Sequence, residues 1–313
     1  MKNLHPHHLT PYLLSAGLLC SPAVFAQETF SSLFTDAKPI LDVRYRYEHV
    51  DQDNALEHAN AQTLRTRVGF QTGKWYGLSA LVEADNVSRL GDAAYNSTRN
   101  GQTDYSVVAD PDGSEINQAL LRYDHAFGNA IAGRQRINLD NQRFVGGVDW
   151  RQSEQTYDGV LGQLQPLDKL TLTYAYINNI NTTFGPGDNR FDNRANPANI
   201  EGHSHLFNAR YAHSPALTAT AYSYLLGLDN IATAPAAALG TLSSKTTGLR
   251  LNGALHGISY ALEYARQQDY ADNPQELSSE YYLAELGYAL KGATLKAGVE
   301  VLGGDSGPGN RAF

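Results

Sequence analysis

The sequence predicts an all-β protein, an antiparallel transmembrane β-barrel, and three observations favour this class. Apolar and polar residues alternate with a period of two along most of the 313-residue chain, and no convincing helical period occurs. The segments that connect the alternating stretches are long and short in turn. Finally, no run approaches the ~20 consecutive apolar residues of a membrane-spanning helix.

The first residues, 1–26, are predicted to be a secretory signal peptide. A lysine precedes the apolar stretch LTPYLLSAGLL, and AVFA forms a small-x-small cleavage site that ends at Ala26. Cleavage there removes Met1 and Cys20, the only methionine and the only cysteine of the chain. The mature chain is therefore expected to form one transmembrane domain over residues 27–313, without disulfides or thiolate metal sites.

The first expected strand sets the pattern for the others. In LDVRYRYEHV (41–50), one face carries Leu, Val and Tyr, and the other face carries Asp, Arg and Glu. The stretches TLRTRVGF, KLTLTYAY, ISYALEY and ATLKAGVEV alternate in a similar way. Thirteen strands are expected in all, at residues 40–49, 61–71, 75–85, 116–125, 129–138, 154–164, 169–179, 203–212, 216–228, 244–253, 257–267, 279–290 and 293–302.

The connections between these strands indicate a membrane barrel rather than a soluble sandwich. Long connections are expected at 86–115, 139–153, 180–202 and 229–243, and a medium one at 268–278. Short turns are expected at Gly73–Lys74, Gly128, Pro166, Pro215, His256 and Gly292. Outer-membrane barrels have short periplasmic turns and longer extracellular loops, whereas a sandwich has no reason to alternate them. A large soluble all-β domain is the alternative.

The side-chain pattern gives the two faces of the sheet different surroundings. An Arg or Lys that faces lipid costs ~2–4 kcal/mol near the bilayer midplane, so charge must be confined to one phase of each strand. In LDVRYRYEHV this places the Tyr face against lipid and the Arg face in a lumen. Two places depart from the pattern: Gln135 falls on the apolar phase, and LTATAYSYLLGL does not distinguish its faces. The expected location is the outer membrane of a Gram-negative bacterium.

The number of expected strands is odd. Single-chain bacterial barrels have an even number of strands, which returns both termini to the same side of the membrane. Thirteen strands therefore predict that the barrel is incomplete at the C-terminus, unless one strand has been missed. The last residues, GGDSGPGNRAF, are typical of the start of a further long loop.

Arginines dominate the phase that is expected to face the lumen. The candidate pore-lining residues on this phase are Arg44, Arg46, Arg65, Arg67, Arg122, Arg134, Arg136, Arg210 and Arg250. Carboxylates share the phase, at Asp42, Glu48, Glu83, Asp85, Asp124, Glu263 and Glu300. Guanidinium groups pair bidentately with carboxylates, so two interpretations stay open. The arginines form a ladder of sites for an anionic, carboxylate-bearing solute, or they pair with lumen carboxylates to brace the pore.

One stretch carries a resemblance to a known family. GRQRINLDNQRFVGGVDWRQSEQTYDGV (133–160) joins two strands through the loop at 139–153, which adds Arg143 and Arg151 to the candidates. It resembles the corresponding segment of the alginate-export family of outer-membrane channels in its order Gly-Arg-Gln, Asp-Asn, Arg-Phe-Val-Gly, Trp-Arg-Gln and Gln-Thr. LDVRYRYE and TLRTRVGF resemble the first two strands of that family.

The resemblance implies a barrel of about eighteen antiparallel strands. It also implies an Arg-lined lumen that conducts polyuronate or smaller anions. Carried over by motif, the first candidates for contact with the solute are Arg134, Arg136, Arg143 and Arg151, followed by Arg44, Arg46, Arg65 and Arg67.

These observations lead to the hypothesis of an outer-membrane channel, not an enzyme, that passes anionic solutes: an acidic, alginate-like polysaccharide or small organic anions. The expected partners are outer-membrane lipid and the anionic solute, and a periplasmic export partner is compatible with the sequence. No nucleic acid, cofactor or metal is expected. The loop at 139–153 is expected to fold inward as a constriction, the alternative being a cap on the outside.

Two other functions are alternatives. A barrel hydrolase is suggested by His203, Ser204 and His205, but adjacent residues of a strand point to opposite faces, whereas catalysis needs its groups in geometric register. An adhesin is suggested by the long loops rich in Asn, Gly and Asp, but the sequence contains no Asp-x-Asp-x-Asp-Gly calcium loop.

Overall fold

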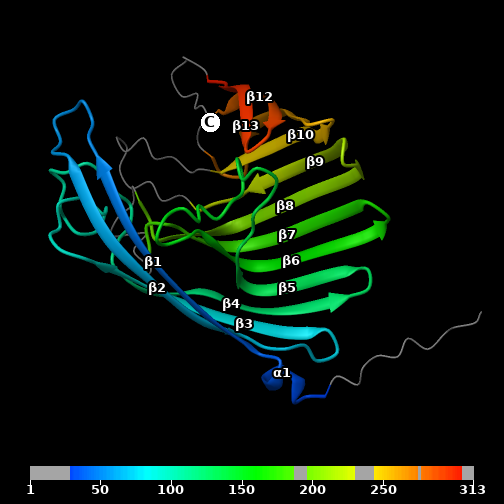
Figure 1. Ribbon diagram of the computed structural model, residues 1–313, viewed down its shortest axis with the longest axis horizontal. Helices are drawn as coiled ribbons and strands as arrows, with labels where there is room; N and C mark the ends of the chain where they lie inside the picture. Colours follow the sequence, from blue (N-terminus) through cyan, green and yellow to red (C-terminus); the bar gives the residue numbers. More distant parts are fainter. Residues whose placement is uncertain (1–28, 187–195, 230–242, 274–275, 305–313) are drawn as a thin grey trace, which may run out of the picture.

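The protein folds as one curved antiparallel sheet. The computed structural model describes residues 29–186, 196–229, 243–273 and 276–304, so the predicted signal peptide lies outside the described residues. Within them, thirteen strands pair antiparallel, each with the next along the chain. Figure 1 shows the sheet bending around a concave interior, with β1 at one edge and β13 at the other. This confirms the prediction of an all-β, antiparallel barrel architecture.

The strands follow one short helix, α1 (Ser32–Thr35), at the start of the described chain. They are β1 (Lys38–Val50), β2 (Ala59–Gln71), β3 (Leu78–Arg89), β4 (Gly113–His125), β5 (Gly128–Gln135), β6 (Thr156–Leu167), β7 (Leu170–Asn181), β8 (Asn199–Ser214), β9 (Leu217–Leu226), β10 (Ser244–Leu255), β11 (Ile258–Asp269), β12 (Ser278–Leu290) and β13 (Ala293–Leu302). In the part of the chain that the structure describes, no helix has the length and hydrophobicity needed to cross a membrane.

Most strands lie within a few residues of their predicted positions, and the differences have local causes. The strand β6 continues through Pro166, which was predicted as a turn, and the turn itself lies at residues 168–169. The pairing of β6 with β7 is interrupted between Leu164 and Leu167. This irregularity lets the strand include a residue that has no N–H to donate.

The predicted alternation of long and short connections is confirmed, but the turn predicted at Gly73–Lys74 is wrong in position: it lies at Tyr76–Gly77, where Trp75 and Leu78 exchange backbone hydrogen bonds of 2.9 Å. Two-residue turns join β4 to β5, β6 to β7, β8 to β9, β10 to β11 and β12 to β13. Because successive strands are antiparallel, these turns share one end of the sheet, and the longer connections that follow β3, β5, β7 and β9 leave from the other end (Figure 1). The helix α1 lies beside the short connection between β2 and β3, where the Gly73 N–H donates to the Leu33 carbonyl at 3.0 Å.

The two faces of the sheet carry opposite kinds of side chain. On the convex face, Leu41 is 73%, Leu121 63% and Leu286 61% exposed. On the concave face, Arg67 and Asp85 are only 8% and 3% exposed. A soluble protein buries its apolar side chains and exposes its charges, so this arrangement is inverted. It suits a sheet with lipid outside and a polar interior.

Candidate pore and its inward loop

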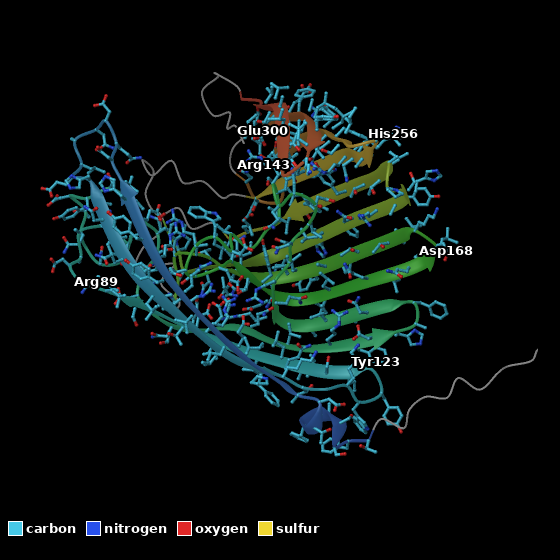
Figure 2. The ribbon with its side chains drawn as sticks, viewed as in Figure 1. Arg89, Tyr123, Arg143, Asp168, His256 and Glu300 are labelled. Atoms are coloured by element: carbon cyan, nitrogen blue, oxygen red, sulfur yellow. The ribbon has the colours of Figure 1, made fainter. Side chains whose placement is uncertain are left out.

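The connection between β5 and β6, residues 136–155, lies inside the concave face and is called the inward loop here. It reaches β1, where Arg44 Nε donates to Gln152 Oε1 at 3.0 Å. It also reaches β12, where the rings of Phe144 and Tyr281 lie 5.4 Å apart. Figure 2 shows Arg143 of the loop beside Glu300 of β13, near the other edge of the sheet. The loop therefore crosses the interior, which confirms the prediction that it folds inward.

The inward loop is held by apolar packing on the side that faces β9 and β12. The Phe144 ring packs against the rings of Tyr222 and Tyr281, with centroid distances of 5.8 Å and 5.4 Å. Ile137 and Val145 belong to the buried cluster that inward-facing apolar side chains of β6 to β12 form on this side of the interior. Burial of large apolar side chains stabilises such a contact by about 1.5–3 kcal/mol each. The interior beside β6 to β12 is therefore packed with apolar side chains where the loop meets it.

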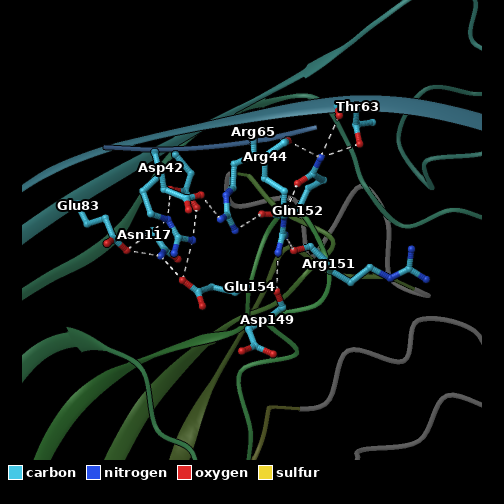
Figure 3. Close-up of polar contacts among 12 residues, drawn as sticks. Asp42, Arg44, Thr63, Arg65, Glu83, Asn117, Asp149, Arg151, Gln152 and Glu154 are labelled. Carbon is cyan, nitrogen blue, oxygen red and sulfur yellow. Dashed lines mark hydrogen bonds and ion pairs between the residues drawn. The ribbon is translucent and has the colours of Figure 1, made fainter. Parts of the chain in front are cut away.

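The two chain ends of the loop, at Arg136 and Glu154, are held by ions. Glu154, which is 4% exposed, accepts a hydrogen bond from Arg136 Nε at 2.7 Å and lies 2.7 Å from Arg67 Nη2. The Asn117 side-chain amide donates to the same carboxylate (Figure 3). Arg67 also donates bidentately to Asp85, with both distances 2.7 Å. Buried charges are tolerated when every partner is hydrogen-bonded in this way.

Gln152 ties the loop to three other segments. Its side-chain Nε2 donates to the Thr63 hydroxyl at 2.9 Å and to the Thr63 carbonyl at 3.1 Å on β2. Its Oε1 accepts from Arg44 on β1, and its backbone N–H donates to Asp110 Oδ1 at 3.0 Å. The side chain is fully buried, so each of these groups has exchanged water for a protein partner. Gln152 therefore fixes the position of the loop against β1 and β2 (Figure 3).

Two carboxyl groups of the connecting segments have shifted pKa values. Burial raises the pKa of Asp110, although the Gln152 N–H and the charge of Arg46 act in the opposite direction. Burial also opposes ionisation of Glu154, but the hydrogen bond from Arg136 and the charges around it outweigh burial and hold the pKa of Glu154 below its ordinary value. Glu154 is therefore charged at neutral pH, as its ion pairs with Arg67 and Arg136 require; these contacts of Glu154 are called the ionic anchor here.

Most of the predicted pore-lining arginines are paired with carboxylates. Ion pairs join Arg46 to Glu48 and Asp110, Arg65 to Asp42, Arg67 to Asp85 and Glu154, Arg122 to Asp124, Arg136 to Glu83 and Glu154, Arg151 to Glu48, and Arg250 to Glu263. A guanidinium that is neutralised in such a network supports the structure more than it attracts a solute. For these residues the geometry favours the bracing interpretation.

Three of the predicted arginines are less neutralised. Arg44 donates to neutral groups of the inward loop, and no carboxylate of the described chain forms an ion pair with it. Arg210 is exposed on the inward phase of β8, where the described residues offer it no hydrogen bond or ion pair. Arg143 lies 3.7 Å from Glu300 at the long end of the ion-pair range. These three guanidinium groups keep a positive charge toward the interior.

Two neighbouring residues of β5 lie on faces opposite to those predicted. The register pairs Gln135 with Tyr157, whose side chain belongs to the interior apolar cluster, so Gln135 points inward. Arg134 is paired with Asp158 and lies on the outward phase, where its Nε and Nη2 donate to the Asp158 carboxylate at 2.7 Å and 3.0 Å. The prediction that Arg134 lines the pore is wrong, whereas Arg136, just beyond the strand, does turn inward to Glu154.

The reversal on β5 has a physical cause. Ile131 and Ile137 share the phase of Gln135, and an apolar phase was expected to face lipid. Both isoleucines instead pack with the interior cluster that the inward loop covers. Where a loop fills the lumen with apolar side chains, the apolar phase of a strand can face inward.

The His-Ser-His stretch of β8 forms no catalytic arrangement. His203 and His205 lie on the outward face, with their Nδ1 atoms 2.7 Å and 3.0 Å from the hydroxyl groups of Tyr176 and Tyr174. Ser204 is buried on the opposite face and donates to a backbone carbonyl. Outward aromatic and polar pairs of this kind suit an interfacial girdle.

Three residues that hold the inward loop in place were not singled out from the sequence: Asn117, Gln152 and Glu154. One signal was present, since Asn117 and Gln118 are adjacent polar residues that break the alternation of their strand. The pairing of β3 with β4 shifts there, which is the mark of a β-bulge that turns both side chains to the same face. Gln152 carries a different signal, since it ends the Trp-Arg-Gln element of the family resemblance. Glu154 carries none, because its partners are distant in the sequence.

Comparisons with known proteins agree with this fold. The chain matches a family model described as alginate export over residues 41–311. Its structure is similar to that of Pseudomonas aeruginosa OccK3 (OpdO), with 16% identity, a TM-score of 0.60, and coverage of 86% of this chain and 64% of that chain. It is also similar to Acinetobacter baumannii OccAB2, with 16% identity, a TM-score of 0.63, and coverage of 86% of this chain and 67% of that chain. For the outer membrane protein OpdK of Pseudomonas aeruginosa, the identity is 12%, the TM-score 0.63, and the coverage 85% of this chain and 66% of that chain. No curated protein matches the chain.

These similarities bear on the chain in different ways. At such low identities the solved structures establish the fold alone, and the chain spans about two thirds of their length. The family model covers most of the chain and describes export rather than catalysis, which confirms the predicted family, the outer-membrane location and the absence of an enzymatic role. The chain belongs to the alginate-export family and has the outer-membrane β-barrel fold of a porin.

Proposed function

We propose that the protein forms an anion-preferring channel through the outer membrane, in which the inward loop narrows the lumen. One observation carries this proposal: Arg44, Arg143 and Arg210 face the interior with incomplete neutralisation by the described carboxylates. A passive pore of this kind conducts in both directions, so the same channel serves export and uptake.

The argument depends on which charges remain after pairing. Around the inward loop, ion pairs join Arg46, Arg65, Arg67, Arg136 and Arg151 to Asp42, Glu48, Glu83, Asp85, Asp110 and Glu154. This network braces the loop, and Arg44, which donates to neutral groups, takes part in none of its ion pairs. The preference of the pore for anions is then set by the single positive charges that lie beside the open lumen, because lumen walls of low dielectric constant concentrate the electric field there.

The solute is proposed to carry a carboxylate. Guanidinium groups bind carboxylates bidentately, and the alginate-export family makes an acidic polysaccharide the first solute to test, with small organic anions as the second. Outer-membrane lipid surrounds the convex face, and a periplasmic export partner is part of the proposal for a polysaccharide solute.

The test is the reversal potential of the full-length protein in a planar bilayer under a KCl gradient. Anion preference is expected, and it should decrease in Arg44→Gln and Arg210→Gln. The matched control is the double variant Arg250→Gln/Glu263→Gln, which deletes a neutral ion pair and should keep the parent selectivity. A parent without anion preference, or single variants that equal the parent, would contradict the proposal.

A further inference from the structure

The convex face carries two pairs of stacked rings across β7 and β8, toward the end of the sheet from which the long connections leave. The ring of His203 stacks on Tyr176 and the ring of His205 on Tyr174, with centroid distances of 6.1 Å and 6.2 Å. The tyrosine hydroxyls lie 2.7 Å and 3.0 Å from the two Nδ1 atoms. A neutral imidazole that accepts a hydrogen bond at Nδ1 carries its proton on Nε2. Neither Nε2 atom has a hydrogen-bond partner among the described residues, so each ring presents a donor to its surroundings.

A lysine lies on the same face, two strands away. The register aligns His205 with Leu225 of β9, and Leu225 with Lys245 of β10, strands that lie side by side in Figure 1. Neighbouring strands are about 4.8 Å apart, so the backbones at His205 and Lys245 are about 10 Å apart. Lys245 is exposed, and no described residue forms a hydrogen bond or ion pair with it. An ammonium group on a lipid-facing row is stable where its tip reaches the polar headgroups. His203, His205 and Lys245 are called the donor patch here.

The outward carboxylates near the donor patch do not separate its members. Asp158 on β6 is neutralised by Arg134, with Nε and Oδ1 2.7 Å apart. Glu201 lies on the outward phase of β8 toward the start of that strand, away from Lys245. The register row between His205 and Lys245 contains no described carboxylate. An anion between these two side chains therefore meets donors on both sides.

An apolar groove with a volume of about 700 Å³ adjoins the donor patch on the convex face. Small residues such as Gly162, Ala209 and Ala221 lie along it, beside the rings of Tyr174 and Phe207. A Cβ atom placed on Gly162 would meet no other atom within 4 Å, so the space above this residue is open. Because Tyr174 both lines the groove and contacts a histidine of the donor patch, the two features are continuous.

We propose that this surface binds one lipid molecule with a phosphorylated headgroup. An acyl chain lies in the groove, and the phosphate accepts hydrogen bonds from His205 Nε2 and from the Lys245 ammonium. The Nε2 of His203, one outward position further along β8, donates to other oxygens of the headgroup. Phosphate oxygens are strong acceptors, and lysine binds them as a point charge. The site lies outside the lumen, so the inference goes beyond the proposed channel function and does not depend on the solute.

The experiment measures lipid bound to the full-length protein by native mass spectrometry from detergent micelles. The probes are dioleoyl phosphatidic acid and dioleoylglycerol, which share their acyl chains and differ in the phosphate. The parent should retain phosphatidic acid at about tenfold lower lipid concentration than dioleoylglycerol, the scale of a hydrogen bond to a charged group. The double variant His205→Phe/Lys245→Gln keeps an aromatic ring at position 205 but removes both donors. It should abolish this difference and leave the retention of dioleoylglycerol unchanged.

The matched control is His213→Phe, since His213 also lies beside a tyrosine of β8, Tyr211, but near the short turn. It should keep the difference between the probes. Gly162→Leu fills the groove and should weaken the retention of both probes by the same factor. The site is refuted if the parent retains both probes equally, or if His205→Phe/Lys245→Gln keeps the difference. A parent that is dimeric without bound lipid, and that Gly162→Leu converts to a monomer, would assign the groove to a second copy of the chain and would also refute it.

Discussion

Replacing Glu154 by glutamine tests the ionic anchor of the inward loop. The substitution keeps the size of the side chain but removes the charge that Arg67 and Arg136 surround. It also places an amide where two cations and the Asn117 amide already donate. The loop should therefore leave its docked position more often while the strands stay folded.

The size of the effect follows from the contacts. Hydrogen bonds to charged groups contribute about 1.5–3 kcal/mol each, but Arg67 keeps Asp85 and Arg136 keeps Glu83, so a net loss of about 3 kcal/mol is expected rather than the full sum. At 1.4 kcal/mol per tenfold change, the population with the loop undocked should rise about 100-fold.

The assay is single-channel recording, in which undocking appears as excursions to a higher conductance. The control is Glu48→Gln, since Glu48 also pairs with loop and strand arginines but its side chain is 22% exposed. Ion pairs that water can reach contribute less than fully buried ones, so this variant should increase the excursions less than Glu154→Gln does. The reasoning is refuted if Glu154→Gln records like the parent, or if both variants show the same increase.

Three further predictions use the same structure. Because the pKa of Glu154 lies below its ordinary value, the contribution of Glu154 to docking is complete above pH 4.5 and is lost as the pH falls through the lowered pKa. Excursions to higher conductance should therefore become more frequent in acid in the parent, and Glu154→Gln should lack this increase. The other carboxyl groups titrate in both proteins, so the difference between the two pH profiles reports Glu154 alone. Phe144→Ala should weaken the apolar anchor by about 3 kcal/mol and expose the loop to limited proteolysis, whereas Phe127→Ala, at an exposed turn, should leave the loop protected. Leu121→Arg, on the lipid-facing row, should destabilise the barrel by about 2–4 kcal/mol in urea unfolding from liposomes, while Leu120→Arg, on the inward row beside Arg122, should cost less; equal effects would contradict the assignment of faces.

Parts of the fold could be predicted from the sequence because they depend on local patterns. The alternation in LDVRYRYEHV predicts both a strand and its faces, since lipid and a polar lumen demand opposite side chains at successive positions. The short connections are set by residues that favour turns, and their regular order predicts an up-and-down barrel. These features involve residues that are close together in the chain.

The candidate site shows where this reasoning stops. The predicted arginines were selected by phase, which distinguishes inward from outward side chains but does not tell a paired guanidinium from an unpaired one. Arg65 and Arg44 share the same inward face and the same kind of strand, yet Arg65 is paired with Asp42 and Arg44 with neutral groups. On β5, the alternation of the strand predicted the wrong face for Arg134, because apolar side chains fill the interior where water was expected.

The sequence by itself therefore determined the strands, their antiparallel order, the two chemically opposite faces and the family. The tertiary structure decided where the inward loop lies, which arginines it neutralises and which it leaves charged. The reason is the distance along the chain over which these contacts form. Arg44 and Gln152 are 108 residues apart, and a contact of that range leaves no local periodicity from which it could be predicted.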